Sequence, residues 1–237
     1  MSNPVYLAAA LDSDVVVLDG PEGRHAATVR RTRVGEVVDL VDGLGTRCTG
    51  TVTAVAKDSV TVAVEQRVSE PVPSPRLVLV QALAKGERGE LAVELATEVG
   101  VDEVVPWRAS RSIAQWEGER GEKALARWRA TAREAAKQSR RAWFPEVRGP
   151  VTTAQIPSIP GRLLVLHESA PTSLSQLALD PVDLVLVVGP EGGVSDDELQ
   201  ELLEAGGTAV RLGESVLRTS TAGAVAIAVV SVRTGRW

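Results

Sequence analysis

The hydrophobic and polar positions of the first seventy residues follow the short-period pattern of β-strands. We expect strands over 15–18, 37–41, 46–56 and 59–68, where β-branched residues alternate or cluster. Turn-forming segments rich in Asp, Gly and Pro separate these runs, and a helical stretch over 23–33 interrupts them. A small barrel is the expected closure, because it leaves few strand edges exposed.

The pattern changes after residues 70–75, a segment with three prolines that favours an extended and stiff connection. Beyond it, apolar runs of strand length alternate with stretches of helical period. The expected strands are 76–83, 102–107, 162–167, 183–188 and 208–212, and the expected helices are 86–99, 119–141, 195–205 and 221–233. This alternation predicts an α/β fold with a mostly parallel sheet and helices on both faces. We therefore expect two domains, 1–72 and 73–237.

Composition argues against a membrane-spanning, secreted, disulfide-rich or metal-binding protein. The 237 residues are 44% hydrophobic, which is ample for a buried core, and no apolar run has the length of a membrane span. The N-terminus lacks the basic stretch of a signal peptide, so we expect a cytoplasmic protein without membrane attachment. Cys48 is the single cysteine, and His25 and His167 are the only histidines, so neither a disulfide framework nor a metal site is expected.

Charge is unevenly distributed along a chain whose net charge is −5. Residues 24–33 contain no acidic residue and four arginines, which are Arg24, Arg30, Arg31 and Arg33. Residues 108–148 contain eleven Lys or Arg against five Asp or Glu. Two basic segments in an acidic chain predict a local electrostatic surface for nucleic acid, with a merely solvated helix face as the alternative for each.

The expected helix over 119–141 has two different faces. Four apolar residues recur at helical spacing and should pack on the core, namely Leu125, Trp128, Ala132 and Ala135. A basic stripe with a spacing of four residues comprises Arg129, Arg133, Lys137 and Arg141. Because Arg108, Arg111 and Arg148 extend the stripe beyond the helix, we expect it to contact nucleic-acid phosphates. Trp143 and Phe144 are expected to pack rather than to stack on a base.

Two glycine-marked loops near the C-terminus each follow an apolar strand and precede a helix. The first is 189–193, Gly-Pro-Glu-Gly-Gly, whose glycines allow backbone N–H groups to approach a ligand closely. Ser195 and Glu198 then have the spacing of a capping box that opens a helix. A tight strand-to-helix connection without a ligand is the alternative interpretation of this loop.

The second loop, 212–223, places Arg218 between apolar and hydroxyl-bearing residues. An arginine in this setting is expected to be partly buried and to need a partner, either a structural carboxylate or an anionic or carbonyl-bearing ligand. The helix that follows is small and apolar on all sides, so it should be buried. Two such loops suggest a ligand bound at the carboxyl edge of a parallel sheet.

Together these loops resemble those of the SPOUT class of methyltransferases. More narrowly, the chain resembles the RsmE family, which methylates uridine N3 in small-subunit (16S) ribosomal RNA. The matching segments are 86–87, 94–100, 138–141, 145–146, 189–198, 212–213 and 216–219. The resemblance implies a PUA-like, RNA-binding β-barrel for residues 1–72 and a SPOUT methyltransferase domain with a C-terminal trefoil knot for 73–237.

The resemblance also implies S-adenosylmethionine as the cofactor, and a homodimer whose pockets lie near the subunit interface. The implied cofactor-binding residues are Leu166, His167, Glu168, Gly189, Gly193, Leu212, Gly213, Val216, Leu217 and Arg218. Backbone groups of the glycine loops can bind the edge of adenine, while Leu and Val side chains cover its faces. The implied partner is small-subunit ribosomal RNA in an assembled subunit. The resemblance therefore also implies a role in ribosome biogenesis.

For the chemistry, we expect Arg218 to stabilise the negative charge that develops on uracil once N3 loses its proton. Glu191, His167 or a water molecule is the expected base. Three alternatives stay open: another SPOUT enzyme that modifies a tRNA base or a ribose 2′-hydroxyl, a non-catalytic RNA-binding module, and an unrelated nucleotide-binding protein. The chain has neither a Walker loop nor a dinucleotide fingerprint, which argues against the last.

Overall fold

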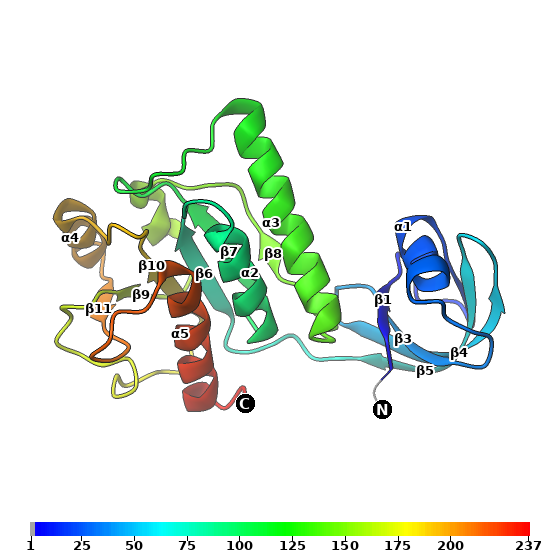
Figure 1. Cartoon of the computed structure of the whole chain (residues 1–237). Coiled ribbons are helices and arrows are strands. Elements are labelled where there is room, and N and C mark those ends of the chain that lie inside the picture. Colours follow the sequence, from blue (N-terminus) through cyan, green and yellow to red (C-terminus); the bar gives the residue numbers. More distant parts are fainter. Residues whose placement is uncertain (1–2) are drawn as a thin grey trace. The chain divides into compact units, whose positions relative to one another are not determined.

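The computed structural model describes residues 3–237, which form two compact units. The first contains residues 3–72 together with Ala136–Phe144, and the second contains Pro73–Ala135 and Pro145–Trp237. Figure 1 shows the elements of both units in sequence colours. Among residues 3–237, no helix is long and apolar enough to cross a membrane.

The first unit is built on a five-stranded sheet with the order β1-β3-β4-β5-β2. The strands are β1 Val5–Leu7, β2 Val15–Leu18, β3 Val37–Val41, β4 Thr46–Val55 and β5 Val60–Ser69. β1 and β3 are parallel, and all other neighbours are antiparallel. Within residues 3–72 the edge strands β1 and β2 do not pair with each other, so strand pairing does not close the expected barrel.

Two register irregularities between β4 and β5 bend these long strands around their core. One of them lies at Gly50, where a Cβ atom would be only 2.3 Å from the carbonyl oxygen of Ala63, so the close approach of two backbones requires glycine. The helix of this unit is α1 Gly20–Arg24, which continues into a π-helical turn, η1 His25–Val29. It ends earlier than expected, because Arg31 adopts a left-handed conformation with φ 54°.

The second unit contains a six-stranded sheet with the order β11-β9-β10-β6-β7-β8, in which all neighbours are parallel. Its strands are β6 Leu77–Ala82, β7 Glu103–Trp107, β8 Glu146–Val147, β9 Arg162–Leu166, β10 Leu184–Val188 and β11 Thr208–Val210. Its helices are α2 Arg88–Glu98, α3 Gly118–Gln138, η2 Thr153–Ser158, α4 Asp196–Glu204 and α5 Thr219–Thr234, and the last residues of α3 group with the first unit. The predicted parallel α/β sheet is confirmed.

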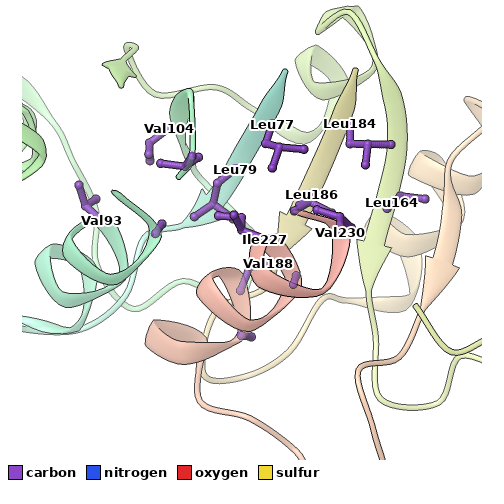
Figure 2. Close-up of a cluster of buried hydrophobic side chains, with 14 of the residues drawn as sticks. Leu77, Leu79, Val93, Val104, Leu164, Leu184, Leu186, Val188, Ile227 and Val230 are labelled. Atoms are coloured by element: carbon purple, nitrogen blue, oxygen red, sulfur yellow. The ribbon is translucent and has the colours of Figure 1, made fainter. Parts of the chain in front are cut away.

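Leucines and valines alternate along the two central strands and separate the core into two layers. One layer contains the leucines, which are Leu77, Leu79, Leu184 and Leu186. These side chains pack with Val93 of α2 and Ile227 of α5, as Figure 2 shows. The other layer contains the valines, which are Val78, Val80, Val185 and Val187, and they pack with Leu202 of α4 and Ile156 of η2. Helices therefore cover both faces, as the sequence predicted.

Two expectations about helix burial have different outcomes. The apolar face of α3 packs on the core as expected, since Trp128, Ala132 and Ala135 are buried and Leu125 is half-buried. The expectation that the last helix is buried on all sides is wrong near its C-terminus, because Val232 of α5 is 64% exposed and Arg233 is also exposed. Helix α5 packs on α2 and on β10 and β6, which leaves the opposite side of its last turns uncovered.

Candidate functional site

Three strand ends meet at one edge of the sheet in the second unit. β9 lies between β11 and β10, and because all three are parallel, their carboxyl ends share this edge. The segments that follow them contain residues 167–168, 189–194 and 211–218. These segments enclose a cavity of about 530 Å³, within the range of roughly 300–1,000 Å³ that is typical of small-molecule sites.

All ten residues that the resemblance implied for cofactor binding line this cavity. They are Leu166, His167, Glu168, Gly189, Gly193, Leu212, Gly213, Val216, Leu217 and Arg218. Two of them are apolar and notably exposed, since Val216 is 78% and Leu217 is 36% exposed. Exposed apolar side chains at the rim of a cavity are typical of a surface that a ligand or partner covers.

The first glycine loop turns sharply at the end of β10. Gly193 has a positive φ of 74°, and its N–H donates to the carbonyl of Pro190 at 2.9 Å. The predicted capping box is confirmed: the N–H of Glu198 donates to Ser195 Oγ at 3.3 Å, and the N–H of Ser195 donates to Glu198 Oε2 at 3.2 Å. The loop is therefore held between a strand end and a capped helix.

Glu198 does more than cap α4. It is buried, and its carboxylate also accepts the N–H of Ser110 at 2.7 Å and the hydroxyl of Thr153 at 3.1 Å. Burial raises the pKa of Glu198, but the hydrogen bonds from Ser110 and Ser195 outweigh this effect, so the pKa lies below its ordinary value. An ionised Glu198 thus fastens the segment after β7 and η2 to the start of α4.

A buried chain of hydrogen bonds joins the two glycine-marked loops. Gln81, at the end of β6, is fully buried and donates from Nε2 to Thr219 Oγ1 at 2.9 Å. The Thr219 hydroxyl in turn donates to the carbonyl of Gly189 at 2.7 Å. Within residues 3–237, Oε1 of Gln81 has no hydrogen-bond partner. Sequence analysis did not single out Gln81, although a polar residue inside an otherwise apolar strand was an available signal.

Glu191 connects the first loop to the start of α2. Its Oε1 accepts the backbone N–H of Lys85 at 3.1 Å and Nη1 of Arg88 at 3.2 Å. Burial raises the pKa of Glu191, but hydrogen bonds from its own N–H, from Lys85 and from Arg88, together with the charge of Arg88, lower it below its ordinary value. A carboxylate stabilised in its ionised form is a weak base, which disfavours one of the expected proton acceptors.

Arg218 is exposed, so the expectation of a partly buried arginine is wrong. The reason is that 213–218 cross the open edge of the sheet instead of entering the core, and the whole segment is exposed. The backbone of Arg218 begins α5, and its carbonyl accepts the N–H groups of Thr221 and Ala222 at 2.8 and 2.9 Å. Its side chain forms no hydrogen bond or ion pair with any residue in the described part of the chain.

The two other arginines of the cavity already have partners. Arg211 donates to the carbonyls of Ala170 and Pro171, each at 2.9 Å, and Arg88 pairs with Glu191. His167 Nδ1 accepts the N–H of Ser169 at 3.3 Å. If His167 is neutral, this contact assigns the proton of the ring to Nε2.

The basic residues expected to contact RNA have different environments. Arg24, Arg30, Arg31 and Arg33 are all exposed in the first unit, and Arg133 of α3 is exposed in the second. Arg129 donates to the carbonyl of Val147 at 3.1 Å, and Arg141 is half-buried.

Lys137 is a correction to the basic stripe. Its Nζ lies 2.7 Å from Glu22 Oε1, and its side chain is only 10% exposed, so it forms a structural ion pair in the first unit and is not available to RNA phosphates. The packing expected for the two aromatic residues after α3 is confirmed. Trp143 donates to the carbonyl of Glu70 at 3.1 Å and covers Gly45, and Phe144 covers Gly43.

Comparison with known proteins gives two family matches. An RNA methyltransferase domain matches residues 71–231, and an RNA methyltransferase PUA domain matches residues 18–65. Ribosomal RNA small subunit methyltransferase E of Mycobacterium tuberculosis (strain CDC 1551 / Oshkosh) is 48% identical over 231 residues, which are 94% of this chain and 88% of the relative. The enzyme of the same name from Bacillus subtilis (strain 168) is 28% identical over 92% of this chain and 90% of its own.

Two solved structures are similar over nearly their full length. A methyltransferase of Legionella pneumophila in complex with the cofactor SAM has a TM-score of 0.90, with 28% identity and 98% of each chain covered. The Ribosomal RNA small subunit methyltransferase E of Neisseria gonorrhoeae bound to S-adenosyl methionine has a TM-score of 0.88 with the same identity and coverage. By the extent and identity of these matches, the chain belongs to the ribosomal RNA small subunit methyltransferase E family of RNA methyltransferases.

Proposed function

We propose that this protein transfers a methyl group from S-adenosylmethionine to N3 of a uridine in small-subunit (16S) ribosomal RNA. Membership of the family supports the reaction class and the RNA substrate. The observation that carries the assignment to this site is the convergence of three distant segments, with all ten residues of the expected pocket, on one cavity. The methylated atom, N3, follows the resemblance to the RsmE family.

The residues of the cavity fit the chemistry of this cofactor. Apolar Leu166, Leu212 and Val216 suit the faces of adenine, and the backbone of the glycine-bearing segments suits its polar edge. A side chain at Gly213 would meet no atom within 4 Å, so this part of the wall is open space. Glu168 and Glu191 on one hand and Arg88 and Arg211 on the other supply both signs of charge for a zwitterionic ligand.

When bound, S-adenosylmethionine supplies the electrophilic methyl group. The chain contributes orientation and charge stabilisation at the uracil. N3 carries a proton that must leave, and negative charge then spreads onto the two flanking carbonyl oxygens. Arg218 is our candidate to stabilise that charge, because its guanidinium is exposed at the cavity and unpaired within the described chain.

The proton of N3 passes to water in this scheme. Glu191 is a weak base because its pKa is lowered, and Nδ1 of His167 already accepts a hydrogen bond. We therefore assign Glu191 the role of holding the start of α2 against the first glycine loop. His167 contributes to the wall of the cavity at the end of β9.

We also propose that the two parts of the chain divide the work. Residues 1–72, as a PUA-like domain, bind RNA through four exposed arginines, Arg24, Arg30, Arg31 and Arg33, and residues 73–237 hold the cofactor. The substrate is an assembled small subunit in the cytoplasm. In α3, Arg129, Arg133 and Arg141 are the candidates for phosphate contacts.

A trefoil knot and a homodimer complete the proposal. The knot is supported by the path of the chain, which passes from β11 at the edge of the sheet across 211–218 to α5, whose first residue is tied to the first loop by the Thr219–Gly189 hydrogen bond. The dimer is supported by the exposed apolar side chains near the cavity and along α5, which are Val216, Leu217 and Val232.

Methyl incorporation tests the function directly. Labelled S-adenosylmethionine is mixed with the protein and, separately, with unmodified small ribosomal subunits, naked small-subunit RNA and tRNA, and the digested nucleosides are identified. We expect label in 3-methyluridine from the assembled subunit. Label in a ribose-methylated nucleoside or in tRNA would overturn the substrate, and absence of both label and cofactor binding would overturn the activity.

A further inference from the structure

A second and larger groove lies in the second unit. Its volume is about 1060 Å³, and it is lined by residues 84–94 at the start of α2, by 114–116, and by the first half of α3. Arg88 lines both this groove and the cofactor cavity, so the two openings adjoin. The reaction scheme above gives the groove no role.

Tryptophan forms the apolar part of this groove. The rings of Trp116 and Trp128 pack edge to face, with centroids 4.9 Å apart and an interplanar angle of 79°. Trp128 is 1% exposed and is fixed in the core, where its ring lies so close to Gly89 that a Cβ atom there would be 2.8 Å away. Trp116 is half-buried and is thus braced on a rigid neighbour. A braced indole with an accessible surface is a suitable platform for a nucleobase.

Charged side chains surround the tryptophan, and both signs are present. The basic ones are Lys85, Arg88, Arg120 and Arg127, and the acidic ones are Glu87, Glu90 and Glu94. Arg127 pairs with Glu90 at 3.1 Å, whereas the side chains of Lys85 and Arg120 are exposed and unpaired within residues 3–237. This lining is too balanced for a duplex, whose phosphates require a dense basic surface, but it suits one base with its phosphate.

We propose that the groove binds a nucleotide that neighbours the target uridine in single-stranded RNA. Its base stacks on Trp116, and its phosphate lies near Lys85 and Arg120. The inference rests on the proposed function, because it places the target base at the adjoining cavity. A target base must leave its stack to expose N3, which costs stacking energy, and a stacking site for the neighbouring base offsets part of that cost.

The test uses small ribosomal subunits from cells that lack this enzyme, and measures KM and kcat for methyl transfer together with the Kd of S-adenosylmethionine. Trp116→Ala should raise KM for the subunit roughly 5- to 150-fold, the range for loss of one stacked base, with kcat and the cofactor Kd unchanged. Trp116→Phe should restore most of the affinity because it keeps an aromatic face. Trp237→Ala, at a 63% exposed position outside the groove, is the matched control.

Arg120→Ala provides a second variant that does not disturb the packed tryptophan pair. It should raise KM by a smaller factor and reduce the salt dependence of binding. An unchanged KM in both Trp116→Ala and Arg120→Ala would overturn the proposal. A parallel loss of cofactor affinity, or a change from dimer to monomer in light scattering, would also overturn it, because the groove would then be structural or an interface between copies.

Failure of the proposed function gives a different result. In that case the wild-type protein transfers no methyl group to any RNA. The groove is then tested separately by quenching of tryptophan fluorescence with oligouridylate, where the wild type should respond and Trp116→Phe should not. Equal quenching in both proteins would refute base stacking at this position.

Discussion

The hydrogen-bonded chain Gln81–Thr219–Gly189 allows a direct test of how the two glycine-marked loops are held together. Thr219→Val removes the hydroxyl but keeps the β-branched shape. Both side chains are inaccessible, since Thr219 is 6% and Gln81 is 0% exposed. Water therefore cannot replace the missing hydroxyl, and the free energy of unfolding should fall by the full contribution of the lost hydrogen bonds.

The magnitude follows from the groups left without partners. The hydroxyl of Thr219 makes two hydrogen bonds, of 2.9 and 2.7 Å, and each contributes about 0.5–1.5 kcal/mol. Its loss leaves the carbonyl of Gly189 without this donor and leaves Nε2 of Gln81 only a long contact of 3.3 Å to the carbonyl of Ala82. We expect Thr219→Val to lower the free energy of unfolding by about 2–3 kcal/mol.

Gln81→Leu should behave differently, although it breaks the same chain. It removes the hydrogen bond to Thr219 and the long contact to Ala82, but it also removes an Oε1 that is buried and unpartnered within the described chain. Replacing a poorly satisfied amide by an apolar group of similar size is close to neutral, so the cost should stay below about 1 kcal/mol. In the double variant no donor is stranded, and the combined cost should be about 1 kcal/mol less than the sum.

The assay is urea unfolding of the four proteins, with and without S-adenosylmethionine, combined with calorimetric measurement of the cofactor Kd. Thr219→Ser keeps the hydroxyl and is the matched control. We also expect Thr219→Val to weaken cofactor binding, because the N-terminus of α5 is no longer fixed to Gly189. The reasoning is refuted if Thr219→Val costs less than about 0.5 kcal/mol, or if Gln81→Leu costs as much as Thr219→Val.

Four further predictions concern single side chains. Arg218→Ala should lower kcat by about 100- to 1000-fold with little change in cofactor Kd, because it removes charge stabilisation at the uracil, and single-turnover kinetics with calorimetry measure both. Glu198→Gln should reduce the loss of unfolding free energy that the protein shows at acid pH. The pKa of Glu198 is lowered in the folded state, so the ionised carboxylate stabilises the fold fully above the unfolded pKa near 4.5. This stabilisation disappears as the pH falls through the pKa of the folded state. Lys137→Met should lower the free energy of unfolding by about 1–3 kcal/mol, because it leaves the mostly buried carboxylate of Glu22 without its partner. Arg133→Ala should reduce the slope of log affinity for RNA against log salt concentration by about one.

The first three of these predictions have outcomes that would contradict them. Arg218→Lys keeps the charge and should retain part of the turnover, and equal losses in kcat and cofactor affinity would contradict the assignment. For Glu198, urea unfolding at pH 6 and at pH 3.5 should show the variant and the wild type converging at the lower pH, and parallel curves would contradict the role of its carboxylate. For Lys137, a weakened RNA affinity without loss of stability would restore it to the contact surface.

The elements that the sequence predicted correctly are those with a strong local signal. The mainly apolar run of β6, the fully apolar run of β10 and the long amphipathic α3 have the period and length that define them. The strands β1 and β8 have only three and two residues, too few to show any period, and pairing with a neighbour creates them. The helix expected over 23–33 was too long because its last turn depends on the left-handed Arg31, which no composition rule indicates.

The candidate site follows the same division. The glycine loops were visible because backbone conformation there depends on residues adjacent in sequence. The exposure of Arg218 could not be predicted from the sequence, because it depends on the path of residues 213–218 across the sheet edge. The ion pair of Lys137 with Glu22 joins residues 115 positions apart, and a four-residue spacing of basic side chains contains no information about it.

Strand order explains why one edge of the sheet carries both openings. β6 lies between β10 and β7, so the segment that leaves its carboxyl end, residues 83–88, emerges beside the first glycine loop. From there Lys85 donates its N–H to Glu191, and Arg88 lines both the cavity and the groove. The same parallel topology that gathers the cofactor loops therefore also fixes the groove with Trp116 next to them. One rigid edge of the sheet would then position both the nucleotide in that groove and the target base at the cavity, without any movement of the core.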